Sequence, residues 1–399
     1  MNKRILIETT GRFALVTVLQ VGVFFLSSNV LSVEEFGYLN ILLAISFIMS
    51  NVAAFGIPNA IVYFGHESKN QLFIKRTVIY HTLFVCVISV LFFMLSRFLF
   101  KGEYDLLVLF FFSQYLFLML NGFLQSKNEI RVLNFASVIQ WVIIFFALVY
   151  IWQIDALISV SQILAIYSIG FFVPVIIFAK RIGFELDVFK RITHSKSKRE
   201  FYSYGIGTFI NSVVSFLNHR LDLMIVGYFL GAGNAGYYSF ASQMCEKMSI
   251  FSQAYCTILF PKLVRIESDK EKSKILIKQI INLVIIISPI FTLFYFVNYF
   301  IIDYFFDDKY VYSYGIIKIL IWSVFVVSVE RLVFTYFSAL GYVKLNAKIG
   351  VFTLLVNAVL SLFLVSINGV VGVAYATLIS SILSAFLAYY YARAINEQI

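Results

Sequence analysis

Ionisable side chains interrupt several long apolar stretches of this chain. Asp222, Glu246 and Arg331 each lie inside such a stretch. A charge in apolar surroundings is costly unless it pairs with another charge, faces water or binds a ligand. An arginine can bind an anionic group, and a carboxylate can neutralise a cation, bind a coupling ion or titrate. These three residues are therefore the leading candidates for chemistry.

Four further charges are weaker candidates for the same roles, namely Arg220, Lys247, Glu330 and Arg12. On an ideal helix Arg220 lies about 160° around the axis from Asp222. A salt bridge to a neighbouring helix and snorkelling toward the outer headgroups therefore stay open for Arg220 beside ligand contact. Arg12, near the start of its apolar stretch, either anchors that helix or meets an anionic headgroup.

Uncharged polar residues recur at helical spacing around these charges. The stretch before Asp222 carries them three, four and seven residues apart, which places them on one face of a helix. Such a stripe either lines a polar cavity or joins helices through hydrogen bonds. The residues selected as candidate contacts to a polar substrate are Asn211, Ser215, Gln243 and Asn357.

The composition shows which elements must position these side chains. The 399 residues are 61% hydrophobic and 13% charged, with a mean hydropathy of +0.90, far from the roughly 25% charged residues of soluble domains. A helix of about 20 apolar residues crosses the hydrocarbon core. The predicted spans are 11–31, 38–64, 76–97, 105–126, 132–153, 158–179, 204–230, 236–262, 276–299, 312–339, 345–367 and 370–392. The last division, at Asn368 and Gly369, leaves eleven spans as the alternative to twelve.

A weak internal repeat suggests that the spans form two similar halves. Five identities recur at an offset of 199 and lie at the same place in each half: Leu31/Leu230, Gly37/Gly236, Tyr38/Tyr237, Met49/Met248 and Ser50/Ser249. The prediction is an all-α membrane protein of two six-helix bundles, 1–180 and 201–399, joined by a basic linker at 181–200. A pseudo-twofold axis along the membrane normal then relates bundles of equal orientation.

Loop charges predict the orientation of the chain, because cytoplasmic loops accumulate lysine and arginine. One face collects most of them: Lys3, Arg4, Lys69, Lys75, Arg76, Lys127, Arg131, the run from Lys180 to Arg199, Lys262, Arg265, Lys270, Lys272, Lys274, Lys344, Lys348 and Arg393. Both termini are therefore expected in the cytoplasm. The net charge of +10 is explained by topology and anionic lipid, so no nucleic-acid partner is predicted.

Motifs for catalysis or cofactor binding are not found in the sequence. The three cysteines lie singly in apolar spans, where thiols usually serve as small packing residues. Neither metal-ligand clusters nor a phosphate-binding glycine loop is recognisable. We predict no cofactor, no metal and no enzymatic activity.

Three sequence runs resemble polysaccharide flippases of the O-antigen transporter (Wzx-type) group. The first is Leu31 to Tyr38 with the following Phe55 to Ala60 turn. The second is Asp222 to Gly227 with Gly236-Tyr237-Tyr238-Ser239. The third comprises Gly341 to Asn346 and Gly369 to Thr377. Their order and spacing extend over nearly the whole chain.

The resemblance implies the multidrug/oligosaccharidyl-lipid/polysaccharide exporter fold, with two bundles that alternate between inward-open and outward-open states. The implied substrate is a polyprenyl-pyrophosphate-linked oligosaccharide, moved across the bacterial inner membrane for O-antigen or capsule synthesis. Arg331 is the preferred cation for the pyrophosphate, followed by Lys247, Arg220 and Arg12. Asp222, Glu246 or Glu330 is then left to neutralise a cation or to bind a coupling proton or sodium ion.

The sequence leaves two alternative functions open. An ion-coupled multidrug exporter of the same superfamily predicts small, often cationic substrates, to which a cavity bearing Arg331 is poorly suited. A membrane-embedded glycan polymerase or ligase predicts a sizeable outer loop, whereas the outer connections here are short and mostly acidic. Since a duplicated chain has its own pathway, we expect a monomer surrounded by membrane lipids.

Overall fold

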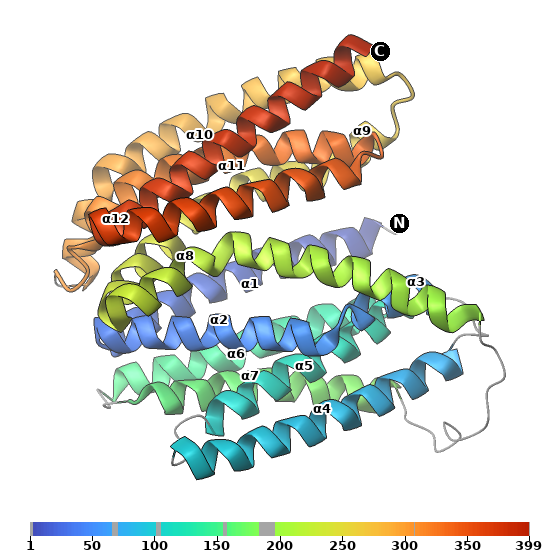
Figure 1. The fold of residues 1–399 in the computed structure, drawn as a ribbon, viewed down its shortest axis with the longest axis vertical. Coiled ribbons are helices and arrows are strands. Elements are labelled where there is room, and N and C mark those ends of the chain that lie inside the picture. The colour runs from blue at the N-terminus through green and yellow to red at the C-terminus, as the bar shows by residue number, and fades with distance from the viewer. Residues whose placement is uncertain are drawn as a thin grey trace. The chain divides into compact units, whose positions relative to one another are not determined.

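The computed structural model describes residues 3–65, 71–100, 105–154, 158–182, 196–306 and 308–398. Within these ranges the secondary structure is helical and contains no strand (Figure 1). The helices are α1 Lys3–Val30, α2 Val33–Ala54, α3 Ile57–Phe64, α4 Gln71–Phe100, α5 Asp105–Ser126, α6 Ile130–Gln153, α7 Val160–Ile182, α8 Lys196–Met248, α9 Ile250–Val264, α10 Asp269–Phe306, α11 Ser313–Ala339 and α12 Val343–Gln398. Most of the predicted linker lies outside the described residues.

Two of these helices, α8 and α12, are each bent at one glycine, so that each forms two spans. Gly231 interrupts α8 at φ 81°, and Gly369 interrupts α12 at φ 57°. Only glycine reaches this region without strain, and an unbroken 56-residue helix would be about 84 Å long, far more than a bilayer needs. Figure 1 shows α12 turning back on itself. The predicted division at Asn368 and Gly369 is confirmed.

Two predicted spans contain a break that the hydropathy pattern does not show. The span at 38–64 divides into α2 and α3 at Phe55 and Gly56, whose φ angles are 49° and 68°. A Cβ at Gly56 would lie 1.9 Å from the Gly205 carbonyl oxygen, so a side chain is excluded there. The span at 236–262 divides at Ser249 into the end of α8 and α9. The bends at Gly231 and Gly369 each separate two spans, whereas α2 with α3, and the second part of α8 with α9, each form one span. On this count the described residues form twelve spans.

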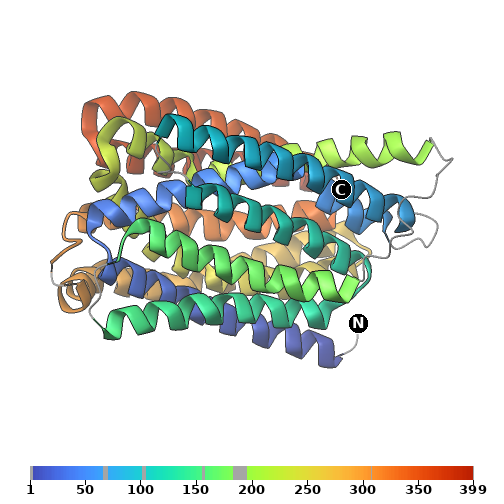
Figure 2. The same cartoon turned by 90° about the horizontal axis from the view of Figure 1, so that it is seen from below.

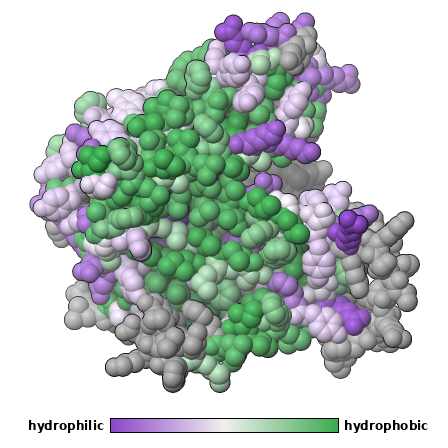
Figure 3. Space-filling view, in the orientation of Figure 1, coloured by the Kyte–Doolittle hydropathy of each residue, from purple (hydrophilic) through white to green (hydrophobic). Residues whose placement is uncertain are grey.

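The helices present apolar surface to their surroundings. Nine helical segments of the described chain are long and apolar enough to cross a membrane. Large apolar side chains are exposed along them, such as Phe84 at 62% and Phe300 at 66%, and Figure 3 shows hydrophobic residues covering most of the visible face. Because water would make such exposure unfavourable, the chain is a multi-pass membrane protein.

The chain divides into two compact units. Unit 1 comprises 1–32 and 42–213, and unit 2 comprises 33–41 and 214–399. In unit 1 the helices α6 and α7 run side by side (Figure 2), and Tyr115, Met119 and Phe178 are buried in its core. In unit 2 the rings of Phe240 and Tyr310 stack with centroids 3.9 Å apart. The domain limits at 180 and 201 remain a prediction.

Candidate functional site

Most of the predicted site residues lie in unit 2. The first arm of α8, 196–230, carries Ser215, Arg220 and Asp222, and its second arm, 232–248, carries Gln243, Glu246 and Lys247. Glu330 and Arg331 lie on α11, and Asn357 lies before the bend of α12. Only Arg12 on α1 and Asn211 on α8 belong to unit 1.

The two arms of α8 are joined by an ion pair. Arg220 donates from Nη1 to Glu246 Oε1 at 3.1 Å and from Nη2 to Oε2 at 3.2 Å. This two-point geometry is the strong form of an arginine–carboxylate contact. The side chains are 28% and 35% exposed, so the pair is only partly withdrawn from its surroundings. The salt bridge that the sequence left open for Arg220 is therefore present.

Lys247 adds a second cation beside this pair. Its side chain is half-buried, and the charges of both Glu246 and Arg220 act on it. In the described part of the chain no carboxylate lies within 4.0 Å of its ammonium group. Glu246 is thus flanked by two cations, of which Arg220 makes the direct contact.

Asp222, two residues beyond Arg220 on α8, is buried and hydrogen bonded. The Tyr238 hydroxyl donates a short hydrogen bond to Asp222 Oδ2. The Leu223 backbone N–H donates to Oδ1 at 2.8 Å, and Thr377 Oγ1 lies 3.4 Å from Oδ2. Donors from both arms of α8 and from α12 therefore surround one carboxylate. Such donors stabilise a negative charge where water is excluded.

A polar network extends from Asp222 along α12. Asn357 Nδ2 donates to Thr377 Oγ1 at 3.4 Å and to Ser380 Oγ at 3.2 Å. Ser361 Oγ donates to Asn357 Oδ1 at 3.4 Å. We call Asp222, Tyr238, Thr377, Asn357, Ser380 and Ser361 the Asp222 network. It spans α8 and both arms of α12 in the middle of apolar helices.

Sequence reasoning missed Tyr238 and Thr377 as members of this network. Both lie in runs that carry the family resemblance: Tyr238 lies within Gly236 to Ser239, and Thr377 ends the run from Gly369. The helical stripes could not find them, because Tyr238 reaches Asp222 only after the chain reverses at Gly231. The sequence signal that could have identified Tyr238 and Thr377 was their position in those two runs.

Glu330 and Arg331 are neighbours in sequence but differ in surroundings. Glu330 is buried and accepts a short hydrogen bond from Ser384 on α12. Arg331 is half-buried, and within the described residues its guanidinium has no ion-pair partner within 4.0 Å. Among the described residues, Arg220 thus has an ion-pair partner and Arg331 does not.

The remaining predicted residues have mixed surroundings. Gln243 donates to Asn40 Oδ1 at 2.9 Å within unit 2, whereas Asn211 and Ser215 are exposed. The Arg12 Nε is buried without a hydrogen-bond partner among the described residues. The structure therefore brings Arg220, Asp222, Glu246 and Lys247 together and leaves Arg12 in the other unit.

This arrangement can bind an anion and exchange a cation. Arg220 and Lys247 balance Asp222 and Glu246, so the cluster is neutral when all four groups are charged. An incoming anion would compete with Glu246 for Arg220, and a proton or small cation would neutralise a carboxylate. The described residues contain no group of three histidine, cysteine or acidic side chains placed to hold a metal.

Sequence comparisons find similar proteins in three organisms. The chain is 25% identical over 389 residues to an uncharacterized membrane protein of Methanocaldococcus jannaschii, with 91% of each chain covered. It is 24% identical over 193 residues to a putative O-antigen transporter of Shigella flexneri, and 24% identical over 200 residues to a probable low-salt glycan biosynthesis flippase, Agl15, of Haloferax volcanii. These two matches cover 48% and 49% of this chain and 46% and 42% of the relatives.

Solved structures show the same fold. The inward-closed lipid II flippase MurJ has a TM-score of 0.78 at 15% identity, with 98% of this chain and 88% of that chain covered. An inward-facing transporter of the multidrug resistance MATE family has a TM-score of 0.73 at 9% identity, with 98% of each chain covered. The predicted all-α exporter fold is confirmed.

The relatives and neighbours named above with a function are transporters or flippases, which confirms the prediction of a transporter rather than an enzyme. The family profile described as "Polysaccharide biosynthesis protein" matches residues 10–267, well over half of the chain. The chain belongs to this polysaccharide biosynthesis protein family.

Proposed function

We propose that this protein is a flippase that moves a polyprenyl-pyrophosphate-linked oligosaccharide across the cytoplasmic membrane by alternating access. The observation that carries the proposal is the Arg220–Glu246 ion pair with Lys247 beside it, inside apolar helices of unit 2. Moving a glycan and a pyrophosphate through hydrocarbon unaided is prohibitively costly. Polar and cationic groups held within the helices remove much of this cost.

Three cations of unit 2 share the pyrophosphate in this proposal. Arg331 makes the first contact, because its guanidinium has no ion-pair partner in the described chain. Lys247 adds charge, and Arg220 joins when the pyrophosphate replaces Glu246. Exchange of one anion for another keeps Arg220 paired, and the displaced Glu246 carboxylate keeps the cation Lys247 beside it.

Polar uncharged side chains serve the glycan in the same scheme. Asn211 and Ser215 are exposed on α8 and offer hydrogen bonds to hydroxyl groups. Gln243 and Asn357 are engaged with neighbouring helices and contribute by rearranging those bonds. Arg12, with its unpaired buried Nε, is the candidate contact of unit 1 for an anionic headgroup.

The Asp222 network is the proposed coupling site. Tyr238, Thr377 and the Leu223 N–H supply donors to one buried carboxylate, so binding of a proton or a sodium ion there would change the bonds between α8 and α12. Glu330, bonded to Ser384, is the second candidate. Both groups link helices, and neutralising either one would alter how those helices pack.

The family and its relatives support the proposed substrate, a lipid-linked glycan, and the proposed alternating-access cycle. A putative O-antigen transporter and a probable glycan biosynthesis flippase are among the relatives, and a lipid II flippase shares the fold. Transporters of the same fold occur in inward-facing and outward-facing conformations. We place the protein in a bacterial inner membrane as a monomer with both termini in the cytoplasm, as the loop charges predict.

Drug export is the second candidate, favoured by the TM-score of 0.73 to a multidrug transporter. A flipping assay in proteoliposomes separates the two. Lipid-linked oligosaccharide, a plain phospholipid and a cationic drug are offered in turn, and glycan exposure is read with an impermeant glycosidase. Flipping of the oligosaccharide alone supports the proposal; transport of the drug with no glycan movement would replace it.

A further inference from the structure

Two tyrosine rings are stacked at the surface of unit 1. Tyr63, near the end of α3, and Tyr204, near the start of α8, have ring centroids 4.5 Å apart and ring planes inclined by 21°. The two residues are 56% and 38% exposed. Each tyrosine therefore keeps surface that a ligand can cover, and covering an aromatic ring is favourable.

Neighbouring groups hold the two rings in place. Phe64 packs edge-on against both, with ring centroids 4.9 Å from Tyr63 and 6.0 Å from Tyr204. Thr208 Oγ1 donates to the Gly56 carbonyl oxygen at 3.4 Å, and α3 lies beside the first turns of α8 (Figure 1). Because the rings are fixed before a ligand arrives, little side-chain freedom is lost on binding.

Tyr204 lies on the polar face of the first turns of α8. Glu200, Gly207 and Asn211 are all exposed, and at about 100° per residue they lie within about 60° of Tyr204 around the helix axis. A Cβ at Gly207 would meet nothing within 4 Å, so space is open on this face. The apolar Ile206, 43% exposed, lies on the opposite face. The stacked pair thus shares its face with groups that bond to hydroxyls, and the apolar face suited to lipid points away from it.

We infer that this stacked pair is a sugar-binding subsite, which rests on the proposed function and gives the glycan of the transported lipid a contact in unit 1. One face of a pyranose ring presents C–H bonds, whose small positive charges are attracted by the negative face of an aromatic ring. The open side of the tyrosine pair accepts that face, and Glu200 and Asn211 bond to the hydroxyl groups around it.

Other parts of the lipid-linked glycan fit this subsite less well. A polyprenyl chain has no hydroxyl groups for Glu200 and Asn211, and a pyrophosphate would be repelled by Glu200 and by the ring faces. A lipophilic cation would use the rings and Glu200 but not the amide of Asn211. The polysaccharide biosynthesis family of the chain favours the sugar over the cation.

Binding to the purified full-length protein in detergent tests the inference with two probes. One is polyprenyl pyrophosphate, and the other is the same lipid linked to a galactose-containing trisaccharide. We expect the unchanged protein to bind the glycosylated lipid about tenfold more tightly than the bare lipid. Tyr63→Ala and Tyr204→Ala should each remove most of this preference without changing the affinity for the bare lipid, which also shows that they fold. Tyr63→Phe keeps the ring and should keep the preference.

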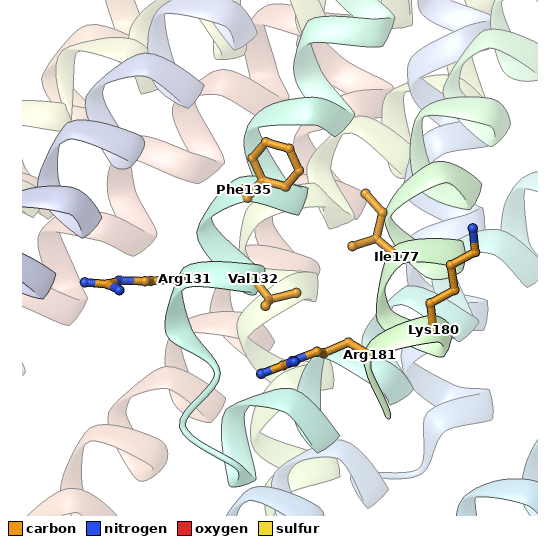
Figure 4. A pocket seen from close by; sticks show the side chains of 6 residues that line it. All are labelled: Arg131, Val132, Phe135, Ile177, Lys180 and Arg181. Carbon is orange, nitrogen blue, oxygen red and sulfur yellow. The ribbon is translucent and has the colours of Figure 1, made fainter. Parts of the chain in front are cut away.

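Phe135→Ala is the matched control. Phe135 belongs to the same unit, is 61% exposed, and lines a separate groove of about 520 Å³ between α6 and α7 (Figure 4). This variant should keep the preference for the glycosylated lipid. An equal loss of preference in Phe135→Ala would show a general effect of exposed aromatic residues and overturn the subsite.

The remaining outcomes separate the subsite from the proposed function. If the tyrosine variants bind both lipids and keep the preference, the subsite is wrong and the flippase proposal stands. If the unchanged protein binds neither lipid, both are wrong. If Tyr63→Ala loses affinity for tetraphenylphosphonium while its glycan preference is unchanged, the pair binds a lipophilic cation and the subsite is again wrong.

Discussion

Arg220 and Glu246 face each other across the two arms of α8, with both terminal nitrogens of the guanidinium bonded to the two carboxylate oxygens at 3.1 and 3.2 Å. The chain reverses at Gly231 between them. This pair therefore depends on the bend. In the proposed function Glu246 is the anion that the pyrophosphate replaces on Arg220, one of the three cations assigned to it.

The pair should contribute measurably to stability. Arg220→Ala and Glu246→Ala each leave a partly buried charge without its partner, and we expect each to cost about 2 kcal/mol, less than a fully buried pair because about a third of each side chain is exposed. Unfolding in a detergent mixture should show a coupling energy of about 1–2 kcal/mol in the double-mutant cycle. Additive single effects would mean that the pair adds no stability.

The sequence predicted the elements better than their contacts. The apolar spans and the bend at Gly369 followed from hydropathy and one glycine. The partner of Arg220 could not be predicted in this way, because a helical wheel gives the direction of a side chain but not the helix that it contacts. Tyr238 was missed for the same reason: its hydrogen bond to Asp222 exists only after α8 turns back at Gly231.

Asp222→Asn should uncouple transport from an ion gradient. The amide keeps a similar shape but removes the charge, so neither a proton nor a sodium ion is held as before. In proteoliposomes, a proton or sodium gradient should accelerate flipping by the unchanged protein and leave Asp222→Asn unaffected. Ser366→Ala is the matched control, since Ser366 lies on α12 outside the network and donates to the Phe363 carbonyl oxygen. An Asp222→Asn variant that still responds fully to the gradient would remove Asp222 from coupling.

Gly37→Ala should weaken the packing of α2 against α8. A Cβ at Gly37 would lie 2.0 Å from the Ala232 carbonyl oxygen and 2.4 Å from the Gly236 nitrogen. Because backbone must shift to make room, we expect a loss of about 2 kcal/mol. Gly315→Ala on α11, where nothing lies within 4 Å, is the control and should melt unchanged. Identical melting of the two variants would argue against this helix contact.

Lys309, in the loop between α10 and α11, gives a pH-dependent prediction. Burial lowers the pKa of its ammonium group, while the charge of Glu35 acts to raise it. Between the lowered pKa and the usual value of 10.5, the unfolded chain therefore binds more protons than the folded chain. The free energy of unfolding consequently rises with pH through that window. Lys309→Met should stabilise the protein near pH 8 and lose this advantage as the pH approaches 10.5. A melting-temperature difference that does not change with pH would contradict the assignment.

In the proposed function, cations of unit 2 carry the pyrophosphate of a lipid-linked glycan. The most direct measurement compares flipping of that lipid in proteoliposomes by the unchanged protein, Arg331→Ala and Lys318→Ala. Lys318 lies on the same helix, over the ring of Tyr314, and serves as the matched cation. We predict a loss of about tenfold or more for Arg331→Ala, the rate equivalent of about 1.4 kcal/mol, and little change for Lys318→Ala. Equal flipping by all three proteins would contradict the claim.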